Sequence, residues 1–180
     1  MFNIDDAMAD VVLKARDPAL AAIKLAWWRE QLQALDVTPP PAEPRLRAVS
    51  DHLIRNGVSG EQVSALEDGW LGVLHRDFDS ASARGLILFG LLAQLLGEQK
   101  TEFQDLGRAW ARADLARRTG ETEWLRQGER TRVRVRRRMR PLTALAALAL
   151  RDEERGFPLE PERTPGRSWA LLRHRVSGRL

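Results

Sequence analysis

Residues 24–32, KLAWWREQL, place two adjacent tryptophans and an Arg-Glu pair inside a helical run, and this stretch decides the fold. Asp17 and Pro18 predict where the helix begins, because Asp caps helix N-termini and Pro fits the first helical position. Its apolar residues form two stripes at helical spacing: Leu20, Ile23 and Trp27 in one, and Leu25, Trp28, Leu32 and Leu35 in the other. So wide an apolar arc predicts a helix packed on two sides, in the centre of a helical bundle.

The charged pair Arg29 and Glu30 falls between these stripes. Charges in such a position have to pair with each other, with a neighbouring helix or with a ligand. The plain interpretation of the stretch is a core helix with a tryptophan pair and flanking charges.

The rest of the chain predicts more helices and no strand, because no stretch sustains an alternation of period two. The predicted fold class is therefore all-α, with about eight helices. Beyond the helix that begins at Pro18, helices are expected at about 4–15, 44–56, 59–74, 80–96, 101–118, 141–150 and 167–176.

Three of these helices carry specific expectations. Ser59 and Gln62 form a capping box, and Ser80 or Ser82 is expected to cap the helix that follows. That helix is apolar nearly all round over 86–96, which favours either the bundle centre or an oligomer contact. In the last helix Trp169, Leu172 and Val176 are predicted to point inward, and the core is expected to be anchored by Trp110, Trp124 and Trp169.

Length and composition narrow the possible functions. With 180 residues, the chain is expected to form a single domain over residues 1–180. It has no cysteine or tyrosine and only three histidines, which excludes thiolate chemistry and disfavours a histidine metal site. No signal segment or membrane-spanning stretch is evident, so we expect a cytoplasmic protein, with a peripheral position on the inner membrane face as the alternative.

Basic charge is concentrated in the second half of the chain. Residues 1–100 hold 10 basic and 14 acidic groups, whereas residues 101–180 hold 19 and 11. The densest tract has seven arginines between 130 and 140, and its candidate anion-binding residues are Arg132, Arg134, Arg136, Arg137 and Arg138. Anionic lipid or a protein is the expected partner, and nucleic acid is not, because the tract lacks interleaved aromatic residues. The alternative is a solvated loop balanced by nearby acidic residues.

Several motifs occur in an order that resembles the squalene/phytoene synthase family. They are Trp27-Trp28-Arg29-Glu30, Pro44-Arg45-Leu46, Gly107-Arg108-Ala109-Trp110-Ala111, Leu142-Thr143-Ala144-Leu145-Ala146 and Pro165-Gly166-Arg167-Ser168-Trp169. The likeness is thin, covers nearly the whole chain, and is greatest to the divergent branch that includes the mitochondrial complex I assembly factor and many bacterial proteins. It implies the isoprenoid-synthase fold, a helical bundle around a deep cavity. It also implies that Trp27, Trp28, Arg29 and Glu30 belong to the family's framework, and we call these four the framework residues.

The family's enzymes join prenyl diphosphates with Mg²⁺ held between two aspartate-rich helices, and this sequence departs from that pattern. Asp6 and Asp10 have the spacing of the first motif, about one residue out of register, and are the candidate metal ligands. Arg117 and Arg118 occupy the position where the second aspartate-rich motif is expected, and Asp114 is the single aspartate upstream of them. Arginine at such a position repels a metal.

Three functional hypotheses follow. The first is a non-catalytic relative without cofactor, a pseudoenzyme that binds a prenyl lipid or acts as an assembly-type partner protein. The second is a Mg²⁺-dependent prenyl diphosphate transferase with a degenerate site at Asp6 and Asp10. The third is an oligomeric helical interaction module that uses the 86–96 helix.

Overall fold

A computed structural model describes residues 1–98, 101–125 and 134–180, and within these ranges it is all-α. Its only β-type pairing there is an isolated bridge between Arg134 and Arg179. The all-α prediction is therefore confirmed. The elements are α1 (Phe2–Leu13), α2 (Pro18–Ala34), α3 (Pro44–His52), η1 (Ile54–Asn56), α4 (Gly60–Ser64), α5 (Leu66–His75), α6 (Phe78–Leu95), α7 (Thr101–Thr119), η2 (Thr122–Trp124), η3 (Arg137–Met139), α8 (Arg140–Arg155) and α9 (Pro165–Ser177).

Side-chain caps fix where several helices begin. Asp17 accepts a hydrogen bond from the Ala19 amide at 2.8 Å with Pro18 at the first helical position, as predicted. The capping box of Ser59 and Gln62 is also present. The predicted helix over 59–74 is, however, two helices, α4 and α5, separated at Ala65.

The predicted cap of α6 was wrong. Asp77 caps this helix and accepts from the amides of Asp79 and Ser80, so the helix begins before either serine. Asp77 also accepts from the Ser80 hydroxyl at 2.6 Å, which uses that hydroxyl inside the first turn. The pKa of Asp77 is lowered, chiefly by these hydrogen bonds from Ser80.

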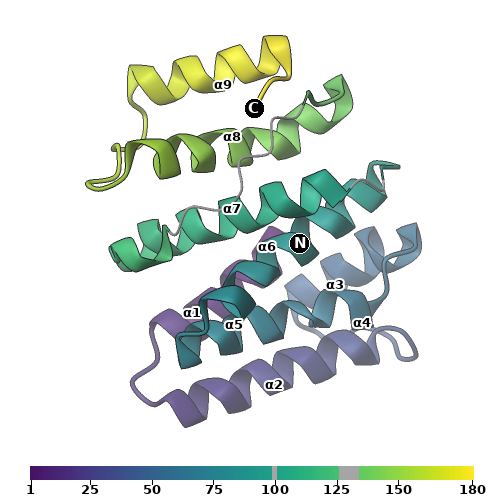
Figure 1. The fold of residues 1–180 in the computed structure, drawn as a ribbon. Helices are drawn as coiled ribbons and strands as arrows, with labels where there is room; N and C mark the ends of the chain where they lie inside the picture. The colour runs from purple at the N-terminus through teal and green to yellow at the C-terminus, as the bar shows by residue number, and fades with distance from the viewer. Residues whose placement is uncertain (99–100, 126–133) are drawn as a thin grey trace.

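Helix α6 lies between α5 and α7, and α7 packs in turn against α8 (Figure 1). Glycines allow the α6–α7 contact to be very close. A Cβ atom placed on Gly85 would lie 2.0 Å from the carbonyl oxygen of Gly107, and one placed on Gly107 would lie 2.0 Å from that of Gly85. Leu88, Phe89 and Leu91 are buried, so α6 lies in the interior of the bundle. This was one of the two predicted alternatives, the other being an oligomer contact.

The predicted central position of α2 is wrong. Helix α2 lies at one edge of the molecule and packs on α1, α4 and α5 (Figure 1). The stripe that contains Leu25 and Trp28 is buried, but Leu20, Ile23 and Trp27 are 50%, 66% and 44% exposed. Only one side of the helix is covered, so only one of its two apolar stripes belongs to the core.

The orientation of α9 also differs from the prediction. Trp169, Leu172 and Val176 point outward and are 65%, 51% and 72% exposed, whereas Trp110 and Trp124 are buried as expected. Helix α9 instead buries Arg167 and His174 against α8. Polar contacts decide which face turns inward, and hydrophobic spacing alone could not reveal them.

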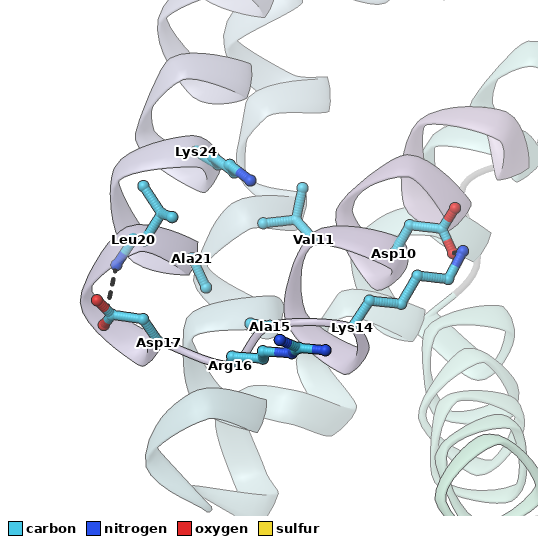
Figure 2. A pocket seen from close by; sticks show the side chains of 9 residues that line it. All are labelled: Asp10, Val11, Lys14, Ala15, Arg16, Asp17, Leu20, Ala21 and Lys24. Atoms are coloured by element: carbon cyan, nitrogen blue, oxygen red, sulfur yellow. Dashed lines mark hydrogen bonds and ion pairs between the residues drawn. The ribbon is translucent and has the colours of Figure 1, made fainter.

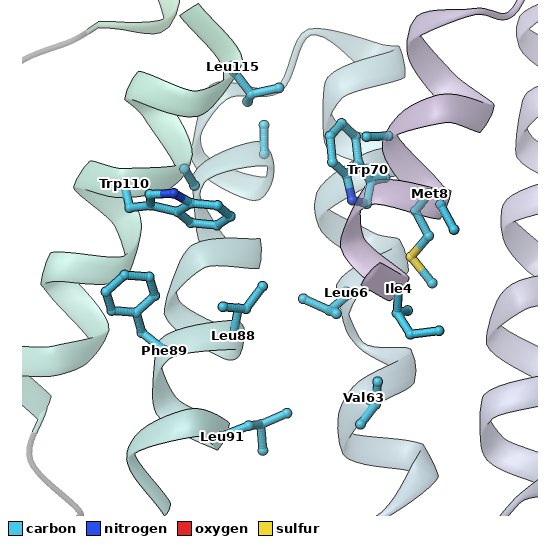
Figure 3. Packing of buried hydrophobic residues seen from close by; sticks show 14 of the residues in the cluster. Ile4, Met8, Val63, Leu66, Trp70, Leu88, Phe89, Leu91, Trp110 and Leu115 are labelled. Atoms are coloured by element: carbon cyan, nitrogen blue, oxygen red, sulfur yellow. The ribbon is translucent and has the colours of Figure 1, made fainter. Parts of the chain in front are cut away.

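Large side chains fill the space between α1, α5, α6 and α7. Figure 3 shows some of these buried side chains, together with Val63 of α4; those it labels are Ile4, Met8, Val63, Leu66, Trp70, Leu88, Phe89, Leu91, Trp110 and Leu115. Burial of such residues is the main favourable term in folding. In the described part of the chain, no helix has both the length and the apolar character to cross a membrane.

Candidate functional site: carboxylates bridged by arginines

The guanidinium group of Arg84 on α6 lies fully buried between α1 and α7. Its Nη1 donates to Asp5 Oδ2 and its Nη2 to Asp114 Oδ2, both at 2.5 Å. The rings of Trp70 and Trp110 lie 4.4 and 4.9 Å from its central carbon, within cation–π range. Trp70 Nε1 also donates to Asp5 at 3.0 Å, so Asp5 has two buried donors.

A second arginine, Arg118 on α7, joins the same two helices nearer the surface. Its Nη2 donates to Asp6 Oδ1 at 2.7 Å, and its Nε lies 2.9 Å from each carboxylate oxygen of Asp114. Burial disfavours the charged form of Arg118, but Asp114 and Asp6 outweigh it and raise the pKa of the guanidinium. Both carboxylates are therefore paired with a permanent cation.

The neighbouring Arg117 connects α7 to α8 and α9. Its Nε and Nη2 donate to Asp152 at 2.8 and 2.7 Å, in the bidentate geometry that favours arginine over lysine. The hydrogen bonds to Asp152 raise the pKa of Arg117. Arg167 on α9 donates to the same carboxylate at 2.5 Å. Both arginines at the expected position of the second motif thus make structural ion pairs.

The two predicted metal ligands do not form an open pair of carboxylates. Asp6 is bound to Arg118, and Asp10 pairs with Lys14 at 2.8 Å on the surface. The hydrogen bond from Lys14 is the main cause of a lowered pKa at Asp10. Among the residues that the structure describes, no three His, Cys, Asp or Glu side chains are grouped so as to hold a metal ion. A divalent cation does not fit between these two carboxylates, because Arg118 already neutralises Asp6 and Lys14 neutralises Asp10.

The framework residues divide between the core and the surface. Trp28 is buried and Trp27 half exposed, with their rings edge to face at 5.1 Å. Arg29 Nη1 donates to Glu67 of α5 at 3.1 Å, so Arg29 pairs with a neighbouring helix, one of the three possibilities noted, while Glu30 is exposed. Burial raises the pKa of Glu67 and outweighs the opposing effect of Arg29.

A pocket of about 330 Å³ lies where α1 turns into α2 (Figure 2). Its wall combines apolar residues such as Val11 and Leu20 with the charged residues Asp10, Lys14 and Lys24. It does not reach the arginine-bridged carboxylates or the framework residues. Of the predicted site residues only Asp10 lines it, next to its partner Lys14.

The arginine tract lies partly within the described residues. Arg132 falls outside them, and Arg134, Arg136, Arg137 and Arg138 are exposed. Val135 between them is buried, and its amide donates to the Gly178 carbonyl at 2.7 Å. Arg136 and Arg138 pair with the largely buried Glu98 at 3.3 and 2.6 Å, so part of the tract has a structural role.

Asp5 and Arg84, the most buried charges of the cluster, were not predicted as site residues from the sequence. A signal was available for Arg84, because it begins an otherwise apolar helical run and a lone charge there needs a partner. Nothing in the sequence singled out Asp5 over Asp6. Comparison of the chain with protein-family models, with curated proteins and with solved structures gave no match.

Proposed function

We propose that this chain is a non-catalytic helical protein that binds a partner through its surface, as an assembly-type protein, and that works without a metal. The observation that carries the proposal is the pairing of Asp5, Asp6 and Asp114 with Arg84 and Arg118. The resemblance to squalene/phytoene synthases implies metal-binding carboxylates on two facing helices. In this chain α1 and α7 carry carboxylates, and guanidinium groups lie between them.

Electrostatics supports the absence of a metal. A Mg²⁺ ion needs several oxygen ligands with little competing positive charge. To bind at Asp6 or Asp114 it would have to displace Arg118, and at Asp114 it would also meet the buried Arg84. The complete burial of Trp70 and Leu88 in the core between the helices favours action through the surface over an interior lipid cavity.

The competing function is a Mg²⁺-dependent prenyl diphosphate transferase that uses Asp6 and Asp10. The deciding assay incubates the purified chain with farnesyl diphosphate and Mg²⁺ and measures released diphosphate. We expect no release above a heat-inactivated control. Release that requires Mg²⁺ and is lost in the Asp6→Ala/Asp10→Ala variant would establish the transferase instead.

A further inference from the structure

Helix α9 is attached to the molecule by its polar face. Arg167 donates to the buried Asp152, and His174 Nε2 lies 2.9 Å from Thr143 Oγ1 of α8. His174 Nδ1 lies 3.1 Å from the Arg179 carbonyl, which fixes the turn after the helix. The opposite face carries Trp169, Leu172 and Val176 into solvent. This arrangement is the reverse of an ordinary surface helix, which buries its apolar side.

The charged side chains on α9 itself are all arginines. Residues 163–180 contain five arginines and no acidic residue. At 100° per residue, Arg173 and Arg175 lie on either side of the line through Trp169 and Val176. Within the described part of the chain, neither of these two arginines makes an ion pair.

The arginine tract adjoins the end of the same helix. Arg134 forms its bridge with Arg179, and Arg140 Nη1 donates to the carbonyls of Arg175 and Val176 at 2.7 and 2.9 Å. The exposed Arg137 lies in this tract, close in sequence to both contacts. The tract therefore lies beside the C-terminal end of α9. The exposed stripe Trp169, Leu172 and Val176 with the flanking Arg173 and Arg175 is what we call the α9 surface.

We propose that the α9 surface docks on an anionic lipid membrane. Exposed Trp, Leu and Val on a helix flanked by arginines suit the interfacial zone, where the apolar face enters the acyl boundary and the cations meet phosphates. Figure 1 shows α9 as an outer layer beyond α8, so a flat surface can reach its full length. This inference does not depend on the proposed function, because an enzyme could dock in the same way.

The test is sedimentation of the full chain with vesicles of phosphatidylcholine alone or mixed with phosphatidylglycerol, without Mg²⁺ or prenyl diphosphate. We expect binding to the anionic vesicles only, weakened by added salt. The Arg173→Gln/Arg175→Gln variant should bind on the order of tenfold or more weakly, given about fivefold for each arginine near the surface. Trp169→Ser/Leu172→Ser/Val176→Ser should also lose binding.

The matched control is Leu20→Ser/Ile23→Ser/Trp27→Ser on α2. These residues have the same spacing and a similar exposure, but lie at the other edge of the molecule. The control should bind like the wild-type chain, and circular dichroism should show that every variant keeps its helices. Equal loss in both triple variants, or no binding of the wild type to anionic vesicles, overturns the proposal; the latter result points to an acidic protein surface as the partner.

Discussion

At the scale of single residues, arginine provides the connections between helices. Arg84, Arg117 and Arg118 each bind a carboxylate from a different helix, and each does so with two donor nitrogens. Arg117 places both on Asp152, whereas Arg84 and Arg118 each divide them between two carboxylates. The composition, with 29 basic residues of which few are lysine, suits this role because the guanidinium group is planar and permanently charged. A buried pair of this kind is costly to break, since the remaining charge has no water.

The first prediction concerns Arg84. Arg84→Met should lower the free energy of unfolding by about 3–5 kcal/mol, because Asp5 would stay buried with Trp70 as its remaining side-chain donor. Chemical denaturation measures this change. The control is Lys14→Met, which removes an exposed pair with Asp10 and should cost less than about 1 kcal/mol. Equal effects of the two substitutions would contradict the structural role of Arg84.

At the scale of the helices, small residues and local ion pairs set the packing. Gly85 and Gly107 bring α6 and α7 into close contact, which positions Arg84 against Asp114. Gly107 belongs to one of the motifs on which the family resemblance is based. The structure gives a physical reason for a glycine at this position, because a side chain there would collide with the backbone of Gly85. The loop between α8 and α9 depends on Glu160, which accepts from Arg151 Nε at 2.6 Å and from Thr164 Oγ1 at 2.6 Å.

The second prediction is that Gly107→Ala lowers the free energy of unfolding by about 1–3 kcal/mol, the usual cost of overpacking. Its Cβ would collide with the backbone of Gly85, which cannot rotate away as a side chain can. Thermal unfolding of this variant should be compared with Gly90→Ala, whose Cβ has only ordinary contacts with Gln104. A Gly107→Ala variant as stable as Gly90→Ala would show that α6 and α7 are not so close.

The third prediction concerns acid sensitivity. Hydrogen bonds from Arg151, and then Thr164, lower the pKa of Glu160 from 4.5 to about 2. A lowered pKa stabilises the folded state above pH 4.5, and this stabilisation is lost as the pH falls from 4.5 toward 2. Glu160→Gln should therefore be less stable than wild type near neutral pH, and the difference should shrink in acid. Urea unfolding of both proteins, at neutral pH and in acid, measures this difference in stability. A difference that does not change with pH would contradict the ionised Glu160 carboxylate as its cause.

The sequence predicted the elements better than their orientation. Caps such as Asp17 and Ser59 are local, and they mark helix starts correctly. Which stripe of α2 is buried, and which face of α9 turns inward, depends on partners far along the chain, such as Asp152 for Arg167. The pairing of Arg118 with Asp6 joins residues 112 positions apart, so only the absence of the second aspartate motif could be read from the sequence.

At the scale of the whole molecule, the two outer helices both expose apolar side chains. Helix α2 exposes Leu20, Ile23 and Trp27, and α9 exposes Trp169, Leu172 and Val176. The two helices differ in the charged residues that they carry. Helix α2 has both signs near its exposed stripe, with Lys24 and Glu30, whereas the charged residues of α9 are all arginines. The molecule is therefore a helical bundle whose interior holds arginine-bridged carboxylates, and its α9 edge is the one that we propose docks on an anionic membrane.

The most direct test of the central claim is a calorimetric titration of the full chain with farnesyl diphosphate, with and without Mg²⁺. If guanidinium groups take the place of a metal, Mg²⁺ should change neither the affinity nor the heat of any binding. Binding that appears only with Mg²⁺, and that Asp6→Ala/Asp10→Ala abolishes, would contradict the claim.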